Sequence, residues 1–200
     1  MKEALLHLSK DKKLKKILTR GLQRVVNESS DLYPSLLKAI AGQQLSVKAA
    51  NTIWNRFLDL FDNRYPDAKI VVETSIEVFR SVGFSYQKGG YLKNIAQFHI
   101  DHALDYGVLK NLNDVDLIEY LTQIKGVGKW TVQMLLMFNF GRKDIFPIDD
   151  LGIQNAIKKL YGFSETGKPL KLKMLALSKK WSPYCSIASF YLWEYKDNVT

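Results

Sequence analysis

Apolar residues that recur every three or four positions are the feature that most constrains how this chain can fold. The pattern is clearest at residues 36–41 and at residues 47–58, where Ser46 precedes the second stretch as an N-cap. This period puts the apolar side chains on one face of an amphipathic helix. Residues 70–72 are β-branched, but no similar stretch nearby could pair with them as a strand. Related helical stripes recur at residues 75–83, 91–98, 114–124, 131–140, 151–160 and 181–195. The chain is therefore predicted to be all-α.

Glycine and polar residues indicate where these helices begin and end. The pair Gly89–Gly90 is expected to interrupt the chain before the next helix. Asp114 is expected to cap a helix that ends at the Gly126 turn. Residues 162–169 are expected to form a polar loop.

Composition excludes several classes of protein and site. The 200 residues suffice for one sizeable core or two small lobes. No apolar run approaches the roughly 20 residues of a membrane span, so no membrane association is expected. Cys185 is the only cysteine, which excludes an intrachain disulfide, a cysteine-based zinc site and a four-cysteine iron–sulfur cluster. A reducing compartment, cytoplasmic or nuclear, is expected.

The net charge points to a polyanionic partner. The chain has 29 Lys and Arg against 20 Asp and Glu, a net charge of +9. Residues 1–30 hold eight basic and three acidic residues, and residues 163–181 hold five and one. Lysine-rich faces also keep helices soluble, so neither cluster specifies a partner by itself.

A glycine turn and an acidic pair carry the chemical information. Residues 124–131 place Gly126 and Gly128 between two apolar stretches. Glycine lets another surface approach the backbone closely, and the amides at the start of the following helix can seat a phosphate. Further along, Asp149 and Asp150 stand at the start of another amphipathic helix. A phosphate seat near two carboxylates suggests chemistry on a nucleic acid.

Five motifs in a fixed order widen this pattern: residues 41–46, 83–92, 124–131, 146–150 and 181–184. In order and spacing they resemble the helix-hairpin-helix DNA glycosylases, specifically the alkylpurine (3-methyladenine) glycosylase II branch. The resemblance covers about residues 34–195.

The resemblance implies one glycosylase unit over residues 1–200, built of two helical lobes with a cleft between them. Residues 34–120 would form the first lobe. Residues 1–33 and 121–200 would form the second, which carries the hairpin and the catalytic Asp, with residues 1–30 packed on it as one helix. The expected form is compact and lacks the amino-terminal sheet domain of the best-known family member.

By resemblance, Asp150 is the catalytic carboxylate. Cleavage of an N-glycosidic bond builds positive charge on the sugar, which an ionised carboxylate stabilises. A helix start favours that ionised form. Asp149 is placed at the base pocket, although capping or support of the helix is the simpler role for it.

Trp130 separates two subclasses of the family. Members that also nick the strand carry a lysine nucleophile at this position, because an amine is needed for a Schiff base. An indole cannot form one, so a monofunctional enzyme with water as the nucleophile is expected. Trp130 is expected to stack on the alkylated base by a cation–π contact, and by resemblance Trp193 is a second aromatic residue that lines the base pocket, with packing in the core as the alternative for each. Met134 stands where relatives often have a pocket tyrosine.

The remaining site residues are also assigned by resemblance. Gln43, Gln44 and Leu45 match the loop that fills the gap left by the flipped base, and either Gln44 or Leu45 would insert. The damaged strand's backbone would be held by Lys125, Gly126, Gly128, Lys129 and Thr131. A Na⁺ or K⁺ ion could sit on the backbone carbonyls of Thr122, Ile124 and Val127. No other cofactor is expected.

The expected activity is hydrolytic release of 3-methyladenine, and of 7-methylguanine as a further substrate, from duplex DNA in base-excision repair by a monomer. Two alternatives stay open: a glycosylase for an oxidised or deaminated base, and a non-catalytic DNA-binding module that uses the hairpin alone.

Overall fold

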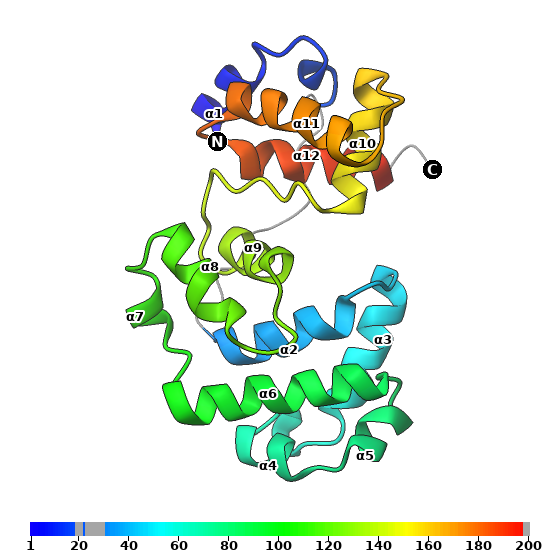
Figure 1. Ribbon diagram of the computed structural model, residues 1–200, viewed down its shortest axis with the longest axis vertical. Coiled ribbons are helices and arrows are strands. Elements are labelled where there is room, and N and C mark those ends of the chain that lie inside the picture. Colours follow the sequence, from blue (N-terminus) through cyan, green and yellow to red (C-terminus); the bar gives the residue numbers. More distant parts are fainter. Residues whose placement is uncertain (19–21, 23–30, 198–200) are drawn as a thin grey trace. The chain divides into compact units, whose positions relative to one another are not determined.

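The computed structural model describes residues 1–18, 22 and 31–197. Within these ranges the regular structure is helical, without a strand beyond one isolated bridge between Asp31 and Asp105 (Figure 1). The all-α prediction is therefore confirmed. No helix in the described ranges combines the length and apolar character needed to cross a membrane.

The helices follow one another as α1 (Lys2–Leu8), η1 (Leu14–Lys16), α2 (Leu32–Gly42), α3 (Val47–Leu58), η2 (Asp62–Arg64), α4 (Ala68–Glu73), α5 (Ile76–Ser81), α6 (Tyr86–His102), α7 (Tyr106–Leu109), α8 (Asp114–Thr122), α9 (Lys129–Phe138), α10 (Leu151–Tyr161), α11 (Gly167–Trp181) and α12 (Cys185–Asp197). They divide into two compact units, residues 28–135 and residues 1–27 with 136–200.

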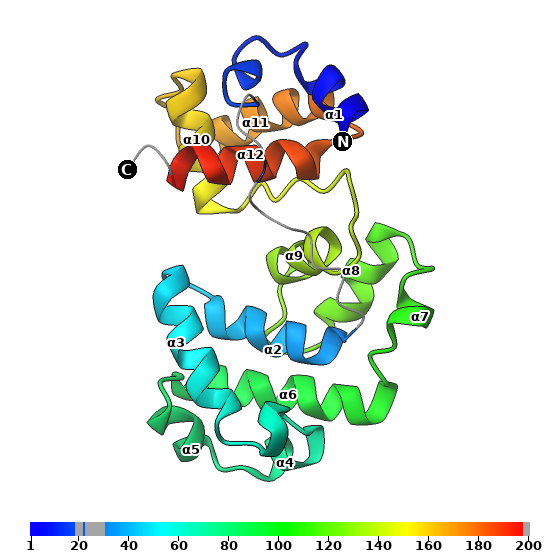
Figure 2. The ribbon, with the colours of Figure 1, turned by 180° about the vertical axis from the view of Figure 1, so that it is seen from behind.

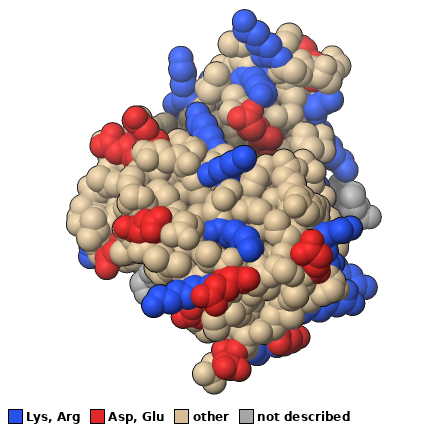
Figure 3. All heavy atoms as spheres, turned by 60° about the horizontal axis from the view of Figure 1, so that its bottom comes forward, with Lys and Arg blue, Asp and Glu red and all other residues tan. Residues whose placement is uncertain are grey.

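Helix α6 is the centre of the unit formed by residues 28–135. It packs against α2 on one side and against α4 and α5 on the other (Figures 1 and 2). Phe57 of α3, which is fully buried, adds an aromatic cluster with Trp54, Phe61, Phe79 and Phe84. On the side of this unit that comes forward in Figure 3, Lys and Arg are interspersed with Asp and Glu. Charge alone therefore marks no binding surface there.

The expected interruption at Gly89–Gly90 is wrong, because α6 runs through both glycines. A Cβ atom on Gly89 would lie 3.0 Å from Cγ2 of Ile76, so the missing side chain lets α5 approach α6 closely. The glycine serves helix packing here and does not break the helix. The β-branched residues 70–72 lie in α4, whose first turn is capped by Asp67.

Local capping signals correspond well to the observed helix starts. Ser46 accepts a hydrogen bond from the Ala49 N–H and begins α3 as expected. At α8 the cap is Asn113 and not Asp114, because the Asn113 side chain accepts from the second and third residues of the helix.

The other unit differs most from expectation in its lysine-rich parts. Residues 1–18 form the short helix α1 and the turn η1 in place of one long helix, while residues 19–21 and 23–30 of that expected helix lie outside the described residues. The sequence pattern does not predict helix α11, which begins at Gly167 inside the loop expected at residues 162–169, and the expected helix at 181–195 begins only at Cys185. The cis peptide before Pro183 separates α11 from α12.

The hairpin also belongs to a different unit from the one expected. Residues 121–135 group with residues 34–120, and not with the unit that holds Asp150. Contacts with α6 explain this placement. The Asn94 side chain donates to the Lys125 carbonyl at 3.1 Å, and the Tyr91 ring lies against Gly126.

Candidate active site and nucleic-acid interface

The segment between α8 and α9 is a tight turn, as the glycine pattern predicts. The Val127 N–H donates to the Ile124 carbonyl at 2.9 Å, and both side chains are buried. Gly126 has φ +106°, and a Cβ atom on it would lie 2.2 Å from Cγ of Tyr91. Only glycine fits there, because both its backbone angle and its surroundings exclude a side chain.

The turn presents backbone and lysine side chains to solvent. Lys125, Gly128 and Lys129 are exposed, and the first N–H groups of α9 point out of its amino end. The Thr131 side chain is buried, with 1% of its surface exposed, and its hydroxyl accepts a hydrogen bond from Gln43. The expected contact of Thr131 with DNA would therefore involve its backbone and not its side chain.

The loop between α2 and α3 holds its three predicted residues in different ways. Gln43 is half-buried, and its side-chain Nε2 donates to the Thr131 hydroxyl at 3.2 Å and to the Gly126 carbonyl at 3.5 Å. Gln44 is exposed and has φ +58°, a left-handed conformation that is rare outside glycine. Leu45 is 41% exposed. The structure thus makes Gln43 an anchor and leaves Gln44 and Leu45 on the surface.

Trp130 and Met134 lie one turn apart on the same face of α9, and both are half-buried. Their expected place at a base pocket stays a prediction. The three carbonyls expected to hold a monovalent cation belong to the end of α8 and the turn after it. One of them, that of Ile124, already accepts the Val127 N–H, which leaves this oxygen a second lone pair.

Asp150 is the N-cap of α10 in the other unit. Its Oδ1 accepts hydrogen bonds from the Ile153 N–H at 2.8 Å and from Nε1 of Trp193 at 2.9 Å. Two donors from different helices thus fix the orientation of one carboxylate. Asp149 is exposed and forms an ion pair with Lys171 of α11, which agrees with a supporting role.

Trp193 is buried, with 7% of its surface exposed, and its ring packs near Phe138 and Phe190. Within its unit the indole therefore holds Asp150 in place, a role that sequence did not indicate. Gly152 makes the approach possible, since a Cβ there would lie 3.0 Å from the Asp150 Oδ1 and 3.1 Å from the Trp193 ring.

Comparison with known proteins decides the family. The sequence-family model of the HhH-GPD superfamily of base excision DNA repair proteins matches residues 37–183. This range includes the loop between α2 and α3, the hairpin turn and Asp150. This chain belongs to the HhH-GPD superfamily.

Individual HhH-GPD relatives are similar over most of this chain. The DNA-3-methyladenine glycosylase 1 of Schizosaccharomyces pombe is 38% identical over 169 residues, which are 84% of this chain and 73% of the relative. The Bacillus subtilis protein YfjP is 37% identical over 168 residues, but the match spans only 58% of its length.

A solved HhH-GPD structure has the same fold. It is the Schizosaccharomyces pombe 3-methyladenine DNA glycosylase in complex with abasic DNA, with a TM-score of 0.87 and 35% identity over 96% of this chain and 95% of that one. The predicted helix-hairpin-helix glycosylase fold is confirmed.

Three contributors to the HhH-GPD site had no role assigned from sequence: Lys88, Asn94 and Gly152. Lys88 stands in a motif of the family resemblance, but its partners are backbone carbonyls, which leave no trace in sequence. Gly152 could have been noticed as a glycine in the first turn of a helix, directly beyond the acidic pair.

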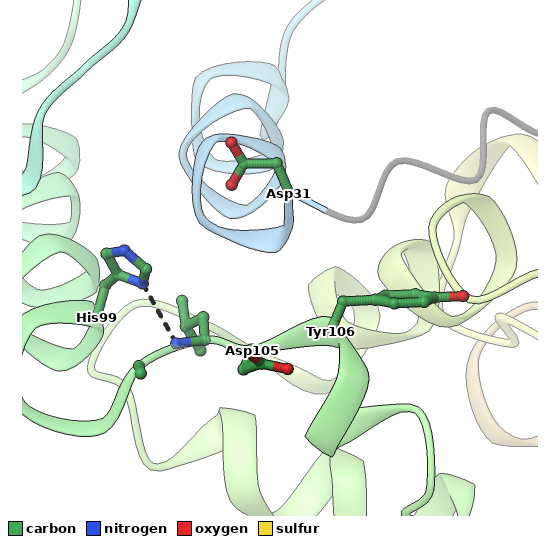
Figure 4. Close-up of a pocket in the computed structure, with 6 residues that line it drawn as sticks. Asp31, His99, Asp105 and Tyr106 are labelled. Carbon is green, nitrogen blue, oxygen red and sulfur yellow. Dashed lines mark hydrogen bonds between the residues drawn. The ribbon is translucent and has the colours of Figure 1, made fainter.

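A separate cavity of about 290 Å³ lies at the amino end of α2, the opposite end from the loop at residues 43–46 (Figure 4). Asp31, His99 and Asp105 are among the residues that line it. The Nδ1 atom of His99 accepts the Leu104 N–H at 3.2 Å, just after Ala103 with its φ of +46°. His99 thus stabilises the sharp turn after α6, which accounts for it as a structural residue.

Proposed function

We propose that this chain is a monofunctional DNA glycosylase that releases alkylated purines, 3-methyladenine first and 7-methylguanine in addition, from duplex DNA. The fixed carboxylate of Asp150 carries the proposal. Relatives at 35–38% identity that are named 3-methyladenine glycosylases support the substrate class. The matched relative solved with abasic DNA supports duplex DNA as the partner.

The proposed chemistry follows from the carboxylate. The damaged nucleotide leaves the base stack, because its glycosidic bond is out of reach inside the duplex. As the bond breaks, positive charge develops on the sugar, and the ionised Asp150 stabilises it or orients the attacking water. A purine alkylated at N3 or N7 is already a cationic leaving group, so one carboxylate suffices.

Hydrolysis without strand cleavage follows from Trp130. The position directly after the hairpin turn lacks the amine that a Schiff base with the sugar would require. We further propose that the exposed Lys125 and Lys129, with the backbone at Gly126 and Gly128, hold the damaged strand of the DNA, and that the protein acts as a monomer. A monovalent cation on the hairpin carbonyls would add positive charge beneath a phosphate.

The test is base release from duplexes that carry one defined lesion each, scored as abasic sites. Asp150→Asn should lose release by at least about a hundredfold while DNA affinity changes little, because a neutral amide cannot stabilise the developing charge. Asp149→Asn is the matched control and should retain most of the activity. Near-normal release by Asp150→Asn would remove Asp150 from the mechanism, and wild-type release of none of the lesions would favour a DNA-binding module.

A further inference from the structure

Helix α6 contacts both elements that are proposed to meet DNA in its unit. Lys88 donates from Nζ to the carbonyls of Ala41 at 3.2 Å and Gln43 at 2.7 Å, at the end of α2. Tyr91 and Asn94 follow at intervals of three residues along the same helix and contact the hairpin turn. One ridge of α6 therefore touches the loop first and the hairpin next.

Gln43 closes the connection between the two elements. Its backbone carbonyl accepts from Lys88, while its side-chain Nε2 donates to the Thr131 hydroxyl and the Gly126 carbonyl of the hairpin. The first residue of the loop is thus bonded through its main chain to α6 and through its side chain to the hairpin.

The ammonium group of Lys88 is held by its hydrogen bonds to the carbonyls of Ala41 and Gln43. Burial lowers the pKa of Lys88, and two carbonyl oxygens replace the water that its charge has lost. A lysine side chain beside the carboxyl end of a helix commonly hydrogen-bonds the last carbonyls of that helix. Here its shorter bond is to Gln43, which lies beyond the end of α2, so the ammonium group fixes the loop as well as the helix.

We propose that Lys88 and Gln43 are positioning residues that lock the loop at residues 43–46 to the hairpin, so that both meet a damaged duplex as one preformed surface. This inference rests on the proposed function. The exposed Gln44 and Leu45 then stand at a fixed distance from the hairpin before DNA arrives. Preorganisation of this kind reduces the entropy lost on binding.

The lock predicts a specific defect. Without it, the loop must be ordered each time a nucleotide is displaced from the stack, so the step that needs the loop should suffer more than binding or bond cleavage. Misplacement of a positioning element by about 1 Å can cost a hundredfold in rate. Excision from duplex DNA should therefore fall about ten- to hundredfold in Lys88→Met and Gln43→Ala, while excision of the same lesion from single-stranded DNA changes less than about threefold.

A fluorescence measurement tests insertion without any catalysis. The probe is a duplex with an uncleavable abasic analogue beside 2-aminopurine, whose emission rises when its stack is opened. Wild type should raise the emission, and Lys88→Met should lose most of that rise at saturating protein. Lys88→Arg, which keeps a cation able to donate to two carbonyls, should restore it.

Lys13→Met is the matched control. Lys13 donates to the Tyr161 carbonyl at 2.7 Å in the other unit, so this variant also loses one charge and one lysine–carbonyl bond. It should keep the fluorescence rise. Equal loss in both variants, or a normal rise and normal duplex excision in Lys88→Met, would overturn the lock. No emission rise with the wild type would also overturn it, whereas a normal rise without base release would overturn the proposed function alone.

Discussion

Asp150 receives its two hydrogen bonds from different parts of the sequence, and this makes the orientation of a single side chain depend on the packing of α10 against α12. The Ile153 N–H belongs to the helix that Asp150 caps, whereas the Trp193 indole reaches it from 43 residues away. The hydrogen bond from Ile153 is part of the N-cap and forms together with α10. The second exists only when the unit has folded.

Trp193→Phe tests the second bond at the scale of one residue. The variant keeps an aromatic ring beside Phe138 and Phe190 but loses the N–H donor. A hydrogen bond to a charged group contributes about 1.5–3 kcal/mol, so the single-turnover rate of base release should fall about ten- to hundredfold. DNA affinity should change little.

Phe190→Leu is the control for this variant, because it disturbs the packing of Trp193 but leaves the indole donor in place. Equal rate losses in the two variants would mean that packing, and not the hydrogen bond, is what matters at Trp193.

At the scale of elements, the hairpin turn depends on Gly126 and on helix α6, which packs against it. Gly126→Ala would force a side chain onto a φ of +106° and into the Tyr91 ring. We expect a loss of about 1–3 kcal/mol in the free energy of unfolding, measured by chemical denaturation. Gly128→Ala meets no atom within 4 Å and should cost little stability. Equal effects of the two substitutions would contradict the close packing described for Gly126.

Sequence predicted an element well where its signal is local. Ser46 and the acidic pair mark helix starts through contacts within three residues, and both were located correctly. The interruption predicted at Gly89 is wrong because this glycine makes room for another helix, α5, which its sequence neighbours do not indicate. Helix α11 carries a buried stripe at Leu170, Met174, Leu177 and Trp181, but five lysines among these positions hid the pattern.

The same distinction holds for the site. The glycine turn and Asp150 can be predicted from sequence motifs. By contrast, Lys88 bonds to Gln43, 45 residues away in sequence, and Trp193 bonds to Asp150, 43 residues away. Neither pairing has a local signature, since each depends on how helices pack. The assignment of residues 121–135 to the unit of α6 depends on packing in the same way.

At the scale of the whole molecule, Asp11 attaches the amino-terminal segment to two late helices. Its carboxylate accepts from the Tyr161 hydroxyl at 2.6 Å and the Trp181 indole at 3.2 Å. Burial raises the pKa of Asp11, but hydrogen bonds from Tyr161, from the Leu14 N–H and from Trp181 outweigh it and hold the pKa below its usual 3.8.

A carboxyl whose pKa is lowered by folding stabilises the protein above its unfolded pKa and loses that contribution as pH falls through its folded pKa. The melting temperature of wild type should therefore decline on acidification below about pH 4, and Asp11→Asn should decline less steeply. Glu165→Gln serves as the control. The ion pair with Lys173 also lowers the pKa of Glu165, but this pair is partly exposed and screened by solvent, so its loss should change the acid profile little. Parallel acid profiles for Asp11→Asn and wild type would contradict the role of Asp11.

The division of the chain also determines an order of events during synthesis. Residues 28–135 are contiguous, so they can fold as soon as they leave the ribosome. The other unit combines residues 1–27 with residues 136–200, so Asp11 emerges long before Tyr161 and Trp181, which donate hydrogen bonds to it. A nascent chain therefore acquires its hairpin, Lys88 and the loop first, and the carboxylate of Asp150 receives its hydrogen bond from Trp193 only later.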